Sequence, residues 1–131
     1  MRVPDAVVPS LVLVAAAAGI LGARLLEAPS VVLDFGPAVA GPSRAVGMVV
    51  QGVRCVDTAE RCAHQLDEVP GVRRFTAWAS RARVEIEYDP AAVDVPALVE
   101  AIEGPVYDGV AREYRFGTYV VREVDGRKTD S

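Results

Sequence analysis

The chain has 131 residues, enough for one small domain and additional segments. Hydrophobic residues make up 51% of it, and part of that excess lies in one block near the N-terminus instead of a domain core. The net charge is −4, and no basic cluster has the pattern of a surface that follows a phosphate backbone. We therefore expect no nucleic-acid partner.

The first feature in chain order is an uncharged apolar run. Residues 6–23 contain no charged side chain over 18 positions, and a helix that spans a bilayer needs about 20 apolar residues. We predict that residues 1–26 form a membrane segment, either an uncleaved anchor or a cleaved signal helix. An anchored domain is expected on the extracytoplasmic side of the membrane, whereas cleavage would release a secreted domain.

Residues 27–44 are predicted to be a linker. Prolines and glycines interrupt this segment at five positions, namely Pro29, Gly36, Pro37, Gly41 and Pro42. Between them, the apolar run from Val31 to Phe35 is expected to lie against the domain or the bilayer. At the other end of the chain, residues 126–131 are expected to be a polar tail.

Residues 45–125 have the pattern of a small α+β domain. A buried strand is predicted over residues 45–53, because this stretch is short and apolar. A helix is predicted near residues 57–68. Asp57 is its expected N-cap, and Glu60, three residues later, matches a capping box.

Two stretches with alternating apolar residues follow this helix. They cover residues 72–80 and 83–89, and the turn between them is placed at Ser80–Ala82. Alternation with one apolar face is typical of a strand that is buried on one side. These stretches therefore predict an antiparallel hairpin.

The last two predicted elements complete a βαββαβ order. A second helix is expected near residues 94–103 with Asp94 as N-cap, and a last strand is expected over roughly Glu113 to Val124. This order packs two helices on one face of an antiparallel sheet. One shared core is predicted to contain Leu66, Phe75, Ile86 and Ile102.

Four blocks of the domain resemble the heavy-metal-associated family. Residues 52–55, Gly-Val-Arg-Cys, are similar to the Gly-Met-x-Cys that opens the family's Cys-x-x-Cys motif. Residues 69–72 resemble the Leu-Pro-Gly-Val after its first helix, residues 88–90 its Tyr-Asp-Pro, and residues 98–103 its second helix. The resemblance covers about 60 of the 131 residues, in the family's order and spacing.

The resemblance implies a ferredoxin-like fold and a metal-binding role. Members of the family are copper chaperones, mercury-binding periplasmic proteins and N-terminal modules of metal-pumping ATPases, and they hold one soft ion between two thiolates. Soft thiolates select ions such as Cu(I) or Hg(II) over hard cations. The implied function is therefore metal binding or metal transport, with copper, mercury or another soft ion as cargo.

The cysteines depart from the family pattern. Cys55 occupies the first ligand position, but the second position holds Thr58. Cys62 follows one helical turn later, where a buried hydrophobic residue is expected, so it is read either as a core thiol or as a weaker candidate ligand. Cys55 is the predicted metal ligand, with Cys62 and Thr58 as secondary candidates, and no Cys55–Cys62 disulfide is expected.

Two functions follow from this pattern. The first is a membrane-tethered module that captures a soft metal ion through Cys55. The second is a protein-interaction module that keeps the fold, has lost the metal and binds no cofactor. Its partner would dock on the open sheet face near Trp78. No catalytic constellation is present in the sequence, so we expect that the chain is not an enzyme, and His64 is expected to be solvated.

Overall fold

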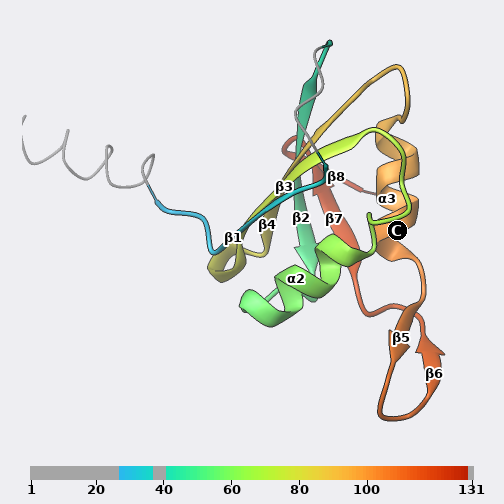
Figure 1. Ribbon diagram of the computed structural model, residues 1–131. Coiled ribbons are helices and arrows are strands. Elements are labelled where there is room, and N and C mark those ends of the chain that lie inside the picture. The colour runs from blue at the N-terminus through green and yellow to red at the C-terminus, as the bar shows by residue number, and fades with distance from the viewer. Residues whose placement is uncertain (1–26, 37–40, 130–131) are drawn as a thin grey trace, which may run out of the picture.

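The computed structural model describes residues 27–36 and 41–129. Figure 1 shows the elements of these ranges. The strands are β1 (Val31–Asp34), β2 (Arg44–Gln51), β3 (Val72–Trp78), β4 (Arg83–Tyr88), β5 (Val106–Asp108), β6 (Glu113–Arg115), β7 (Val120–Val124) and β8 (Arg127–Lys128). The helices are α2 (Val56–His64), the short 3-10 helix η1 (Ala79–Arg81) and α3 (Val95–Glu103).

Six strands form one antiparallel sheet in the order β1-β3-β4-β2-β7-β8. The four inner strands, together with α2 and α3, have the predicted βαββαβ order. Both helices lie against the sheet face on which the buried side chains gather. The predicted α+β architecture, two helices on an antiparallel sheet, is therefore confirmed.

The core is built from alternate residues of the inner strands. In β4, for example, Val84, Ile86 and Tyr88 are buried, whereas the residues between them are only partly covered. The four residues predicted to share one core are fully buried in a single cluster: Leu66, Phe75, Ile86 and Ile102. Burial of apolar surface of this kind is the main force that holds the helices on the sheet.

The predicted hairpin and second helix are present. Strands β3 and β4 pair directly, and η1 is followed by its C-cap Ala82, whose left-handed backbone (φ 53°) turns the chain into β4. Helix α3 is capped as expected, because Asp94 Oδ1 accepts a hydrogen bond of 2.9 Å from the Ala97 backbone N–H.

The first helix is shorter than predicted and begins earlier. We expected residues 57–68 with Asp57 as N-cap, but α2 covers Val56–His64 and its N-cap is Cys55. Thr58 provides the reason, because its hydroxyl accepts the Cys55 backbone N–H at 2.9 Å and fixes the helix start two residues upstream of Asp57. Residues 65–68 form turns.

The last predicted strand is also corrected. Residues 113–124 do not form one strand. Instead, β6 pairs with β5 in a separate two-stranded hairpin, and β7 pairs with β2 in the main sheet. The interruption contains Gly117, whose positive φ of 72° is compatible with a turn and not with an extended strand.

Parts of the predicted linker and tail belong to the sheet. Strand β1 pairs with β3, with Leu33 opposite Phe75, and Val31 is buried in the core. Strand β8 pairs with β7 at the other edge. The apolar run of the linker is therefore packed on the domain, which was one of the two positions predicted for it.

The predicted membrane segment, residues 1–26, lies outside the described residues. In the ranges that are described, no helix has the length and apolar character needed to cross a bilayer.

Candidate metal centre

Cys55 lies at the N-terminus of α2, on the loop that leaves β2. Its side chain is exposed, and its backbone is extended, with φ −149° and ψ 178°. Gly52 allows the chain to leave the sheet at this point, because its φ is +109° and a Cβ there would collide with the Thr118 carbonyl. The loop thus places a thiol in solvent at the positive end of a helix dipole, where a negative charge is stabilised.

Thr58 binds the Cys55 loop from the first turn of α2. Its Oγ1 accepts backbone N–H groups from Arg54 at 2.8 Å and from Cys55 at 2.9 Å. A hydroxyl has two lone pairs and one proton, so these bonds use its acceptor capacity. Thr58 is therefore part of the frame of the loop, and its oxygen is not free to bind an ion.

The remaining proton of the Thr58 hydroxyl has two acceptors within reach. One is the Cys55 carbonyl at 3.0 Å, which also accepts the Ala59 N–H, and the other is Cys55 Sγ at 3.5 Å. Because both lone pairs are occupied, the contact with sulfur is best made with the hydroxyl as donor, and a thiolate is a far better acceptor than a thiol. This hydrogen bond, followed by one from the Thr58 backbone N–H, lowers the pKa of Cys55 below its ordinary value.

Cys62 is in the opposite situation. Its side chain is fully buried on the inner face of α2, and burial raises its pKa to about 12. A thiol must lose its proton to ligate a metal ion. Both cysteines are free thiols, as expected. Cys62 packs as a core thiol, which was one of its two predicted roles.

Tyr119 is a site residue that the sequence analysis missed. Its ring is buried just before β7, and its hydroxyl donates a hydrogen bond of 2.7 Å to the Thr58 carbonyl. This bond joins the first turn of α2 to the last inner strand. No local pattern in the sequence signals it, because the two residues are far apart along the chain and meet only in the folded sheet.

In residues 27–36 and 41–129, Cys55 is not part of a larger cluster of metal-ligating side chains. His64 is exposed, as predicted, and its Nδ1 lies 3.0 Å from Asp67 Oδ2. Among the described residues, no group of three or more histidine, cysteine, aspartate or glutamate side chains is arranged to hold a metal ion. The described part of the chain therefore offers one exposed thiol, that of Cys55, as a soft ligand.

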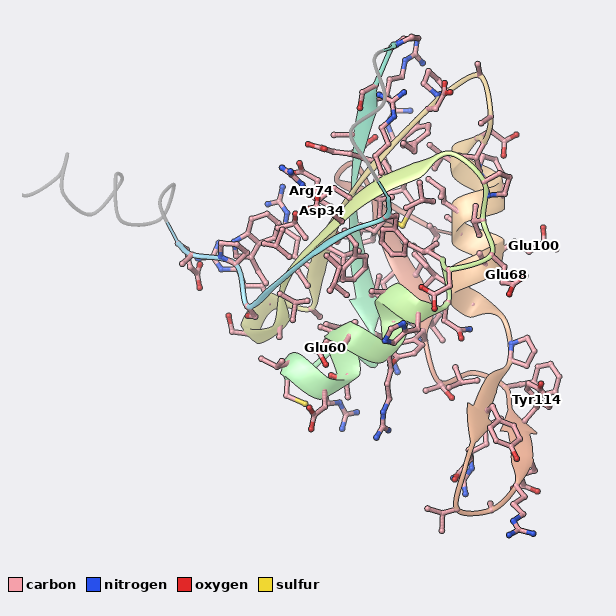
Figure 2. All side chains as sticks on the ribbon, in the orientation of Figure 1. Asp34, Glu60, Glu68, Arg74, Glu100 and Tyr114 are labelled. Atoms are coloured by element: carbon pink, nitrogen blue, oxygen red, sulfur yellow. The ribbon has the colours of Figure 1, made fainter. Side chains whose placement is uncertain are left out.

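The sheet face opposite the helices carries mainly charged and polar side chains. Figure 2 labels Arg74 and Asp34, which form an ion pair of 2.7 Å between β3 and β1. Further along β3, the Trp78 indole N–H donates to the Glu27 carbonyl at 3.0 Å, and the Arg83 guanidinium lies 5.9 Å from the ring centroid. Trp78 is therefore partly covered by the segment that precedes β1.

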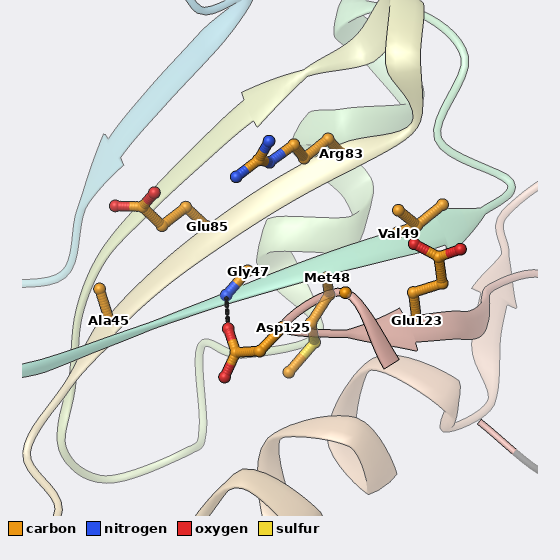
Figure 3. Close-up of a pocket in the computed structure, with 9 residues that line it drawn as sticks. Ala45, Gly47, Met48, Val49, Arg83, Glu85, Glu123 and Asp125 are labelled. Atoms are coloured by element: carbon orange, nitrogen blue, oxygen red, sulfur yellow. Dashed lines mark hydrogen bonds between the residues drawn. The ribbon is translucent and has the colours of Figure 1, made fainter. Parts of the chain in front are cut away.

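A shallow hollow of about 330 Å³ lies beside this region (Figure 3). Its charged lining residues come from β4, β7 and the β7–β8 turn: Arg83, Glu85, Glu123 and Asp125. Asp125 closes one side, because its carboxylate accepts the Gly47 backbone N–H at 2.9 Å. The hollow has mixed charge and no cysteine, so it does not extend the thiol site.

Comparisons with known proteins give a distant likeness in fold. No protein-family model matches the chain, and no curated protein matches it. Among solved structures, the fold is similar to that of oxidized MerP from Ralstonia metallidurans CH34, with 17% sequence identity and a TM-score of 0.44. The match covers 63% of this chain and 100% of that chain.

Proposed function

We propose that this chain is a membrane-tethered, single-thiolate metal-binding module. The observation that carries the proposal is the Cys55 thiol, which is exposed at the N-terminus of α2 with its pKa lowered by Thr58. A thiol of this kind supplies the soft ligand that Cu(I) or Hg(II) prefers. The resemblance of residues 52–55 to the opening of a heavy-metal-associated motif supports the same position.

The second ligand in this proposal comes from outside the chain. Cys62 is fully buried, and moving it to the ion would open the core around α2. Opening a packed core costs several kcal/mol, whereas a second copy or a partner cysteine reaches Cys55 directly. A soft ion would therefore be held between two molecules. The proposed action is binding and transfer, with no catalytic step.

The tether in this proposal is the apolar segment of residues 6–23, which is free of charged residues. We propose an extracytoplasmic domain, because the uncharged apolar run of residues 6–23 is like those of exported proteins. Flotation of the full-length chain with vesicles tests the anchor. If the soluble fraction of cells contains the chain without its N-terminal segment, the anchor is contradicted.

The metal proposal is tested by titration of the full-length chain, in detergent solution, with Cu(I). The expected result is metal-induced dimerisation with one ion for two chains. Cys55→Ser abolishes it, and Cys62→Ala serves as a matched control that leaves it in place. Tight binding of one ion to one monomer, lost equally in both variants, would contradict the proposal, because it would show that Cys62 reaches the ion.

A second candidate function is protein interaction without metal. The β5–β6 hairpin favours it, because the hairpin and the residues next to it expose apolar and aromatic side chains, with Val110 97% and Phe116 80% exposed. Tyr114, labelled in Figure 2, lies on the same hairpin, and its ring packs edge-on against Tyr107. Exposed aromatic residues are enriched at protein interfaces. The open face near Trp78 stays a second proposed docking surface.

A photocrosslinking residue at position 114 tests this candidate in cells. A discrete adduct that forms equally in wild-type and Cys55→Ser backgrounds would support metal-independent interaction. Its absence, or its loss in Cys55→Ser, would contradict it.

A further inference from the structure

The exposed hydrophobic side chains of the domain gather at the start of α2 and on the β5–β6 hairpin. Among the described residues, six large hydrophobic side chains are exposed, and Val32, on β1, is the one that lies elsewhere. Single exposed apolar residues are normal on a protein surface, whereas a cluster of them indicates a contact site. The cluster consists of Val56, next to Cys55, and of Tyr107, Val110, Tyr114 and Phe116 on and beside the hairpin.

The hairpin is attached to the loop that carries Cys55. Gly52 in that loop lies so close to the chain after β6 that a Cβ there would collide with the Thr118 carbonyl. The next residue, Tyr119, donates its hydroxyl to the Thr58 carbonyl at 2.7 Å. Figure 1 shows the hairpin extending past α2, away from the main sheet. A protein that approaches Cys55 therefore has the hairpin beside it.

A hollow of about 590 Å³ lies between the hairpin and α2. Arg61 lines it from α2, and Tyr107, Val110 and Arg115 line it from the hairpin. The Arg115 guanidinium is held across the hairpin by the Asp108 carboxylate, at 2.9 Å. The hollow joins the exposed side chains of the hairpin to the surface of α2, so a partner that enters it contacts both elements at once.

The charges of these two elements balance. Residues 54–61 carry two arginines and two acidic residues, and residues 106–116 also carry two of each. The chain as a whole has a net charge of −4. A surface that pairs with its own copy must be apolar or carry both signs, because a single sign repels itself. This surface meets both conditions, so its charge and apolar character suit a second copy of the chain.

A contact beyond the metal is needed to select the second thiolate. An ion held by one exposed thiol can take its other sulfur from any free thiol, including a small one such as glutathione. A second protein also loses translational and rotational freedom when it binds. Buried apolar surface offsets that loss, and a small thiol has none to offer.

We propose that the β5–β6 hairpin selects a second copy of this chain as the partner that completes the soft-metal site at Cys55. This inference rests on the proposed metal binding by Cys55. The hairpin of each copy lies against the other copy, with Val110 and Phe116 as the apolar contacts. The two Cys55 thiolates then hold the ion between them.

The test measures how well the Cu(I) dimer of the full-length chain, in detergent solution, resists glutathione. Sedimentation gives the fraction of dimer. Val110→Ser with Phe116→Ser removes two exposed apolar side chains of the hairpin, and Val32→Ser is the matched control on β1. The double variant should dissociate at about tenfold less glutathione than the wild-type chain, because it buries less apolar surface. Val32→Ser should behave as the wild-type chain does.

Two outcomes separate this inference from the proposed function. If the wild-type chain forms no dimer with Cu(I), the proposed function is wrong and the inference fails with it. If the dimer forms but the double variant resists glutathione as well as the wild-type chain, the inference alone is overturned.

A photocrosslinking residue at position 110 provides a second measurement that leaves Phe116 in place. The expected result is a covalent pair of chains that forms with Cu(I) and is lost in Cys55→Ser. A Cu(I) dimer that gives no such adduct, or an adduct that forms equally without Cu(I), would overturn the inference.

Discussion

Cys55 and Cys62 lie within about two turns of the same helical segment and have opposite properties. Cys55 is exposed at the N-cap of α2, and a hydroxyl and a backbone N–H lower its pKa. Cys62 faces the core, and burial raises its pKa to about 12. The comparison shows that the position in a helix, and not the residue type, decides whether a thiol is a ligand or a packing group.

Reaction with a thiol reagent gives the largest expected difference between the two residues. In the native protein, we expect iodoacetamide to modify Cys55 readily, while Cys62 reacts only when the core opens. With a stability of about 5 kcal/mol or more, that opening makes Cys62 at least about 10³-fold slower. Mass spectrometry over time measures both rates, and Cys55→Ser is the control that should leave only the slow phase. Comparable alkylation rates for Cys55 and Cys62 would contradict the opposite properties of the two thiols.

The pH dependence of stability is the second way to test the burial of Cys62. The folded chain keeps a proton on Cys62 to a pKa of about 12, whereas the unfolded chain releases it near 9.0. The stabilising difference is therefore fully present below pH 9 and is lost as pH rises above 9, by about 1.4 kcal/mol per pH unit. Buried Tyr119, whose pKa burial also raises to about 12, adds a loss of the same sign above pH 10.

Urea unfolding at pH 8, 9 and 10 measures this loss. Cys62→Ala should remove most of the decrease between pH 9 and pH 10. Cys55→Ser, the matched variant at the exposed position, should keep that decrease. If all three proteins lose stability in parallel, Cys62 is not the group responsible.

The smallest expected effect is that of the Thr58 hydroxyl on the reactivity of Cys55. Thr58→Val removes the hydroxyl but keeps the shape of the side chain, so the pKa of Cys55 should return toward its ordinary value of 9.0. At neutral pH, we expect a few-fold slower alkylation of Cys55, and Thr58→Ser should restore the wild-type rate. The measurement is the pH profile of alkylation. A profile that Thr58→Val leaves unchanged would mean that the helix dipole alone activates the thiol.

The sequence was sufficient to predict three of the four inner strands and the presence of the two helices, and it allowed for the burial of Cys62, because these depend on the spacing of apolar residues within short segments. Leu66, Phe75 and Ile86 could be assigned to one core from their periodicity alone.

The sequence was not sufficient where distant residues decide the local structure. Asp57 is a better intrinsic N-cap than Cys55, but the Thr58 hydroxyl binds the Cys55 backbone, and Tyr119, just before β7, binds the Thr58 carbonyl. Strand β1 forms because it pairs with the free edge of β3. Its four residues are too few for a periodicity that would predict this strand. Strands β6 and β7 were predicted as one strand, since alternation does not show where a chain changes partners, and β5 was not predicted.

The position of β2 has a consequence for the order of events during synthesis. This strand pairs on one side with β4 and on the other with β7, where Gln51 lies opposite Val120. Until residues 120–124 have left the ribosome, β2 is an unpaired edge, and the Tyr119 bond to α2 cannot form. A chain that stops short of β7 would therefore expose both an aggregation-prone strand and a loosely held thiol loop, so a premature stop codon after residue 105 should give an insoluble product.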